Sequence, residues 1–101
     1  MVVLFVRLRA KRERADEVAA ALADLPALVE DEPGTLTFAV HRARDEPDLF
    51  LFYEVYTDDA ALRAHQAGAM VREFGARIGD ALAGPPEITY ATGLAAKGGP
   101  G

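Results

Sequence analysis

The hydrophobic positions of the chain follow two different periods, which predict four strands and two helical regions. Alternating or continuous runs of Val, Leu, Ile, Phe and Tyr predict the strands. The predicted strands span residues 2–9, 35–41, 49–57 and 87–95. Pro33 and Gly34 mark a turn before the second strand, and the polar segment 45–48 joins the second and third strands as an antiparallel hairpin.

Two segments carry apolar residues at helical spacing. The first, at 11–32, is alanine-rich, and Pro26 is expected to end or kink its helix near Leu25. The second runs from a cap at Thr57 or Asp58 to a Gly-Pro-Pro stop, and Gly68 permits a break within it.

The resulting order of elements is β-α-β-β-α-β, which predicts an α+β fold of the ferredoxin-like type. The strands would form a four-stranded antiparallel sheet with both helical regions on one face. The other face would carry Val, Leu and Phe without cover, so we expect a homodimer in which two sheets pack face to face. We assign residues 1–95 to a single domain and expect residues 96–101 to form a disordered tail.

Composition narrows the classes of partner and site. The chain has 101 residues and a formal net charge of −5, which disfavours a nucleic-acid partner because phosphate binding needs clustered Lys and Arg. It has no cysteine, which excludes disulfides, thiolate nucleophiles and zinc–thiolate sites. The apolar run at the N-terminus is too short to span a membrane, and its charges follow it rather than precede it. We therefore expect a cytoplasmic protein with no membrane partner.

Two titratable residues fall where apolar residues would pack better. Helical spacing places His65 on the same stripe as Leu62, and strand alternation places Glu54 on the same face as three aromatic rings. Both can be structural, since a buried carboxylate is costly unless it is paired with an arginine or a histidine. Both can also be functional, with His65 as a general acid or base. Glu54 would then be a base itself, or the carboxylate that sets the tautomer of His65.

The other polar residues suggest no further site. No pair of histidines or carboxylates has a convincing metal-ligand spacing, so we expect no metal. His41 lies beside Arg42 and Arg44 and is interpreted as a surface residue at the end of the hairpin.

The central half of the chain carries an E-P-G turn, an aromatic residue four positions later, a Y-E-x-[WY] strand, a D-x-x-A-L helix start and a histidine. In this combination of motifs it resembles the antibiotic biosynthesis monooxygenase (ABM) family. Here these features are Glu32-Pro33-Gly34, Phe38, Tyr53-Glu54-Val55-Tyr56, Asp58 or Asp59, Ala61-Leu62 and His65.

The resemblance implies a dimeric α+β barrel of ferredoxin-like subunits, each with an apolar cavity between sheet and helices. It implies a small aromatic substrate, such as a polycyclic phenol, an anthrone or a quinol. It also implies molecular oxygen as the second substrate and no cofactor. On this reading His65 removes a phenolic proton and Glu54 orients it. The expected substrate-binding residues are Phe38, Phe52, Tyr56, Met70 and Phe74.

The chain departs from the family pattern at four positions. Phe38 stands where tyrosine is frequent, Tyr56 where tryptophan is common, and Met70 where many members have a second histidine. Each change removes a polar group from the expected site. Gly75 stands where related haem-degrading members carry the haem-ligating histidine, which argues against haem degradation.

Two other functions remain open from the sequence. One is a small-ligand-binding barrel without chemistry, in which Glu54 and His65 form a structural pair. The other is an isomerase of a small oxidised metabolite, which would use the same scaffold and consume no oxygen.

Overall fold

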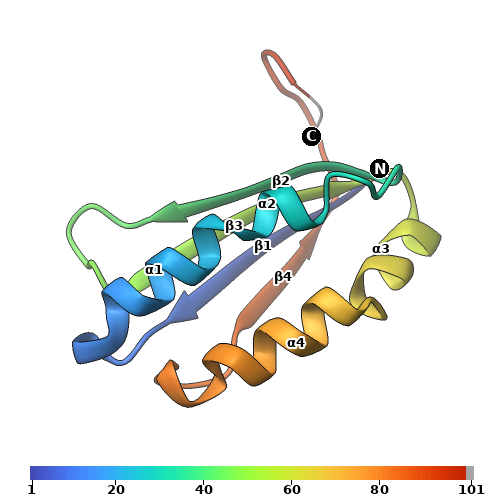
Figure 1. The fold of residues 1–101 in the computed structure, drawn as a ribbon. Helices are drawn as coiled ribbons and strands as arrows, with labels where there is room; N and C mark the ends of the chain where they lie inside the picture. Colours follow the sequence, from blue (N-terminus) through green and yellow to red (C-terminus); the bar gives the residue numbers. More distant parts are fainter. Residues whose placement is uncertain (100–101) are drawn as a thin grey trace.

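The computed structural model describes residues 1–99 and shows a sheet with helices on one of its faces (Figure 1). Its strands are β1 (Val2–Arg9), β2 (Thr35–Arg42), β3 (Leu49–Tyr56) and β4 (Glu87–Ala91). Its helices are η1 (Arg12–Arg14), α1 (Ala15–Ala23), α2 (Leu25–Leu28), α3 (Asp59–Gln66), α4 (Ala69–Ile78) and η2 (Gly79–Ala81). The β-α-β-β-α-β order and the ferredoxin-like α+β fold are therefore confirmed.

The strands form a single antiparallel sheet in the order β2-β3-β1-β4. Strand β1 pairs with both β3 and β4, and β2 pairs with β3. The register places Leu4 of β1 and Phe38 of β2 on either side of Glu54 in β3. Glu54 therefore lies in the interior of the sheet rather than at an edge.

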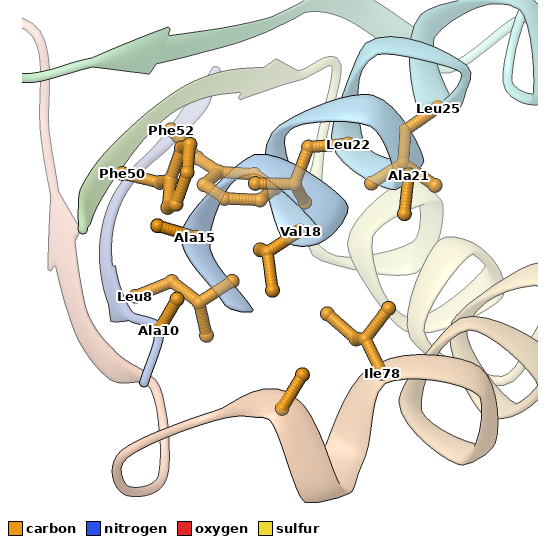
Figure 2. Packing of buried hydrophobic residues seen from close by; sticks show 11 residues of the cluster. Leu8, Ala10, Ala15, Val18, Ala21, Leu22, Leu25, Phe50, Phe52 and Ile78 are labelled. Atoms are coloured by element: carbon orange, nitrogen blue, oxygen red, sulfur yellow. The ribbon is translucent and has the colours of Figure 1, made fainter. Parts of the chain in front are cut away.

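The main hydrophobic core lies between α1 and the sheet (Figure 2). Val18 and Leu22 of α1 are at most 1% exposed and pack with Phe50 and Phe52 of β3. Ile78, at the end of α4, joins the same core from the second helical region. This packing fixes α1 and the last turn of α4, whereas the first turns of α4 are only partly buried.

Proline and glycine divide the helical regions close to the predicted positions. Helix α1 ends at Ala23, and Pro26 stands in the first turn of α2, where its missing N–H leaves no helical hydrogen bond unmade. The carboxylate of Asp58 caps α3 by accepting a hydrogen bond from the backbone N–H of Ala61 at 2.8 Å. Gly68 separates α3 from α4 as the N-cap of the second helix.

The last strand is shorter than predicted. It ends at Ala91, which pairs with Val3 near the start of β1, so little partner strand remains beyond it. Residues 92–99 form neither helix nor strand, and residues 100–101 of the predicted tail lie outside the described residues. Within residues 1–99, none of the helices has the length and apolar character that a membrane span requires.

The face of the sheet opposite the helices carries an aromatic pair. Phe5 of β1 lies opposite Tyr53 of β3, and their ring centroids are 5.4 Å apart. Phe5 is 50% exposed, which is high for a phenylalanine on an inner strand. The helices drawn in Figure 1 lie on one side of the sheet.

Candidate functional site

An apolar cavity of about 230 Å³ lies between the sheet and the second helical region. The strands contribute Phe38, Phe52 and Glu54 to its wall, and the helices contribute His65, Met70 and Phe74. Among the lining residues that the structure describes, Glu54 and His65 are the only ionisable ones. The cavity therefore brings together both titratable candidates and four of the five predicted substrate-binding side chains.

Tyr56, the fifth predicted substrate-binding residue, lies behind the cavity wall rather than in it. Its ring is 0% exposed and packs with Leu4 and Leu62, because α3 covers this end of β3. The ring centroid of Tyr56 is 5.3 Å from that of His65, and its hydroxyl donates a hydrogen bond to Oε1 of Glu54. Tyr56 thus contacts both titratable residues from the side away from the cavity.

Glu54 is buried in apolar surroundings. It is 6% exposed, and its neighbours across the sheet are Leu4 and Phe38. Burial raises the pKa of the Glu54 carboxyl, and this effect outweighs the hydrogen bond from Tyr56 and the nearby His65, which both lower it. Burial also raises the pKa of Tyr56, so its hydroxyl stays protonated and able to donate.

His65 is held by Glu32 and not by Glu54. Its Nδ1 lies 2.8 Å from Oε1 of Glu32, and the hydroxyl of Thr35 donates to the same oxygen at 2.7 Å. No hydrogen bond in the described part of the chain joins His65 to Glu54. The expectation that Glu54 orients the imidazole is therefore corrected, because the turn before β2 places a second carboxylate closer to the ring.

This contact favours one form of the imidazole. A carboxylate at Nδ1 favours the tautomer with its proton on Nδ1, which leaves Nε2 as the basic nitrogen. The ring of Phe38, whose centroid is 5.6 Å from that of His65, and the ring of Tyr56 pack beside the imidazole and restrict its rotation. The orientation of the His65 ring is thus fixed from several sides.

His65 also borders a second hollow, between the turn before β2 and α3. This hollow has a volume of about 440 Å³ and is lined by the 31–35 turn and by residues of α3. Glu32 belongs to it, and the side chain of Glu32 is 32% exposed. His65 therefore lies between an apolar cavity and a carboxylate that is in contact with solvent.

Sequence reasoning missed Glu32, although the E-P-G motif contains it. Periodicity reports which residues share a face, and it carries no information about a contact between a turn and a helix 33 residues later. The signal available in the sequence was a glycine at position 34. In the structure, a Cβ at this position would lie 2.4 Å from Cβ of Ala61 in α3. A glycine in the turn and a small residue at the start of α3 indicate a close approach.

The remaining polar candidates lie apart from the cavity. His41 is exposed, and its Nδ1 lies 3.3 Å from the carbonyl oxygen of Leu51, in agreement with a surface position. Among residues 1–99, no group of three or more His, Asp or Glu side chains is arranged to hold a metal ion.

Comparison with family models assigns the part of the chain that forms this site to a known family. The family model described as antibiotic biosynthesis monooxygenase matches residues 1–77. The chain belongs to the antibiotic biosynthesis monooxygenase family. The match includes the whole E-P-G turn, β3 and α3, which supply Glu32, Glu54 and His65. A search of curated proteins gave no match.

Solved structures agree with the family assignment. A Nitrosomonas europaea protein described as of unknown function is 31% identical, with a TM-score of 0.86 over 99% of this chain and 95% of that chain. PA3566 from Pseudomonas aeruginosa is 30% identical, with a TM-score of 0.84 over 93% of this chain and 94% of that one. A structure named antibiotic biosynthesis monooxygenase is 21% identical, with a TM-score of 0.86 over 94% of this chain and 100% of that one. The last likeness shows the fold alone.

Proposed function

We propose that this protein is a cofactor-independent monooxygenase that oxidises a small phenol or quinol with molecular oxygen. The observation that carries the proposal is the position of His65, an imidazole in the wall of an apolar cavity with Nδ1 held by a carboxylate. The family match supports this class of reaction.

The chemistry begins with a proton transfer from substrate to enzyme. Nε2 of His65 takes the proton of a phenolic hydroxyl, so the O–H bond breaks and an N–H bond forms. The electron-rich phenolate can then pass an electron directly to oxygen. For a phenol with hydrogen at the para carbon, the products are a quinone and water, and the substrate supplies all four electrons. The apolar walls of the cavity keep water away from the phenolate.

The volume of the cavity limits the size of the substrate. An apolar cavity of about 150 Å³ accommodates one benzene ring, and sites for drug-sized ligands span about 300–1,000 Å³. The observed volume of about 230 Å³ lies between these sizes. We therefore propose a substrate with one ring or two fused rings.

The direct test is oxygen uptake by chelator-treated protein. The panel comprises one- and two-ring phenols and quinols, including 1-naphthol and naphthalene-1,4-diol, with buffer oxidation subtracted. With 1-naphthol and labelled oxygen gas, mass spectrometry should find one labelled atom in each product molecule. The absence of uptake above the buffer rate over the whole panel would contradict the proposed function.

Glu32→Gln should lower kcat by about 10- to 100-fold, as expected when the group that orients a catalytic histidine loses its charge. The neutral amide holds Nδ1 less specifically and does not stabilise the imidazolium formed after proton transfer. Nitrogen-15 NMR of His65 should show a smaller population of the Nδ1-protonated tautomer. Glu30→Gln is the matched control, because Glu30 is exposed and lies two residues away in the same turn. An unchanged kcat and an unchanged tautomer would show that Glu32 does not position His65.

We also propose that two copies associate through the outer face of the sheet. The half-exposed Phe5 and its neighbour Tyr53 supply an apolar centre for such an interface. Light scattering should give the mass of a dimer, and Phe5→Asp should shift it toward the monomer. Leu28→Asp is the control, since Leu28 is 61% exposed but lies on α2. A wild-type chain that is monomeric at micromolar concentration would contradict this arrangement.

A further inference from the structure

Glu54 has no part in the proton transfer described above, although it lines the same cavity. His65 supplies the base and Glu32 holds it, which leaves the second ionisable group of the wall unexplained. A buried carboxyl group among aromatic rings is costly, so a residue that only filled space here would be better replaced by an apolar one. The two oxygens of Glu54 differ in their surroundings, and this difference suggests a role.

One oxygen is satisfied within the protein and the other is open to the cavity. Oε1 accepts the hydrogen bond from the hydroxyl of Tyr56. Oε2 makes no hydrogen bond to the residues that the structure describes. Every fully buried side-chain oxygen or nitrogen in that part of the chain has a partner, so Oε2 must retain some accessible surface. Because Glu54 lines the cavity, this surface faces the ligand space.

The groups that face Glu54 provide little to stabilise a negative charge. Tyr56 of the same strand donates one hydrogen bond, and His65 of α3 is the nearby residue that can carry a positive charge. The neighbouring strands present Leu4 and Phe38 across from it, and α4 contributes only apolar side chains to the cavity wall. Within the described residues, no Lys or Arg forms an ion pair with Glu54. Burial therefore dominates and raises the pKa of the carboxyl group, which favours its neutral form.

We propose that Glu54 is a neutral carboxylic acid whose Oε2–H donates a hydrogen bond to a carbonyl oxygen of the substrate. The proposal rests on the proposed function in taking His65 as the base at the helical wall. When Nε2 of His65 receives the hydroxyl proton, the electron pair of the broken O–H bond stays on the substrate. Conjugation spreads this charge to the carbonyl oxygen, where the hydrogen bond from Glu54 becomes stronger. The substrate class is thus a phenol or enol conjugated with a carbonyl group, on one or two fused rings.

A matched pair of ligands tests the hydrogen bond without turnover. The probes are 4-acetyl-1-naphthol and 4-ethyl-1-naphthol, which differ in whether a carbonyl group or a methylene group is attached to the ring opposite the hydroxyl. Calorimetry under nitrogen gives the ratio of their dissociation constants for wild type, Glu54→Gln and Glu54→Met. The ratio measured for Glu54→Met contains only the effects of ligand hydrophobicity and acidity, so dividing the other ratios by it cancels these effects. Relative to that variant, the wild type should favour the acetyl compound by about 3- to 10-fold, the value of one neutral hydrogen bond.

The Gln variant separates a neutral Glu54 from an ionised one. An amide also donates a hydrogen bond, so Glu54→Gln should keep the preference for the acetyl compound. If Glu54 were ionised, the wild type would repel the carbonyl oxygen and only Glu54→Gln would show the preference, which would overturn the proposal. Equal ratios in the wild type and Glu54→Met would overturn it too. The binding measurements are made without oxygen and do not depend on turnover. If they show the preference for the acetyl compound but the separate assay shows no oxygen uptake, the proposed monooxygenase activity is refuted and the role of Glu54 remains.

The charge state of Glu54 has a second signature, in the stability of the fold. A carboxyl group whose folded pKa is raised binds more proton in the folded state than in the unfolded state. Relative to Glu54→Gln, the wild type should therefore lose stability as pH rises from about 4.3, the ordinary pKa of glutamate, through the folded value. Urea unfolding across this range measures the difference, and the infrared difference spectrum between the two proteins should show a protonated carboxyl band at pH values above about 4.3, where an ordinary glutamate is mostly ionised. A stability difference that does not change with pH, or the absence of that band, would contradict a neutral Glu54.

Discussion

His65→Ala is expected to lower kcat for oxygen uptake by about 10²- to 10⁴-fold, the usual contribution of a positioned general base. The substitution removes the only basic side chain among the described residues that line the cavity. The fold should persist, because the carboxylate left behind, Glu32, is one third exposed and can be hydrated. Thermal unfolding followed by circular dichroism should therefore show a folded protein that has lost turnover.

The same chain supplies the control for this experiment. His41→Ala removes the other histidine, which is exposed and does not line the cavity, and it should leave kcat unchanged. Added imidazole should partly restore turnover in His65→Ala, because the deleted side chain leaves space beside Phe38 and Tyr56. If His65→Ala kept wild-type turnover, the base would have to be sought elsewhere, and Glu54 would be the first candidate.

Gly34→Ala is expected to lower the free energy of unfolding by about 1–3 kcal/mol, the range seen when a methyl group is forced into a packed site. The new Cβ would lie 2.4 Å from Cβ of Ala61 and 3.3 Å from Oγ1 of Thr57. The Cβ of Ala61 is fixed to the backbone of α3, so relief requires the helix to move away from the turn. That movement would separate His65 from Glu32, and kcat should fall together with stability.

Two variants isolate this contact. Gly75→Ala adds the same atom inside α4, where nothing lies within 4 Å, and should be stabilising by about 0.5–1 kcal/mol because alanine favours helix. Ala61→Gly in the Gly34→Ala background removes the clashing atom and should recover part of the lost stability. Urea unfolding measures all three. Equal stability of Gly34→Ala and wild type would mean that the turn and α3 are not in tight contact.

Local pattern was sufficient for the order of the elements and for the faces on which several site residues lie, whereas the cavity itself was expected only from the family resemblance. Alternation along β3 placed Phe52 and Glu54 on the face that the helices cover, and helical spacing placed His65 toward the same space. Tyr56 is two residues from Glu54 on the same face, so the hydrogen bond between them was within reach of the same reasoning. The exclusion of Tyr56 from the cavity could not be predicted in this way, because the exclusion depends on how far α3 extends over the end of β3.

The hydrogen-bond partner of His65 depends on geometry that periodicity does not carry. Glu54 and Glu32 both lie near the imidazole, and the choice between them rests on the path of the turn before β2. That path is fixed by the approach of Gly34 to Ala61 and by the hydrogen bond from the backbone N–H of Thr57 to the carbonyl of Gly34 at 2.9 Å. Such contacts join residues distant in sequence, and they follow from the assembled fold.

The position of His65 between two hollows separates the path of the proton from the path of the substrate. Under the proposed function, the imidazolium formed when Nε2 takes the phenolic proton can exchange its Nδ1 proton with solvent through Glu32, whose carboxylate borders the second hollow. The aromatic ring can stay in place while this happens, since the two routes share only the imidazole. The proton on Nε2 passes to the reduced oxygen when water forms, and this restores the tautomer of His65 that carries its proton on Nδ1.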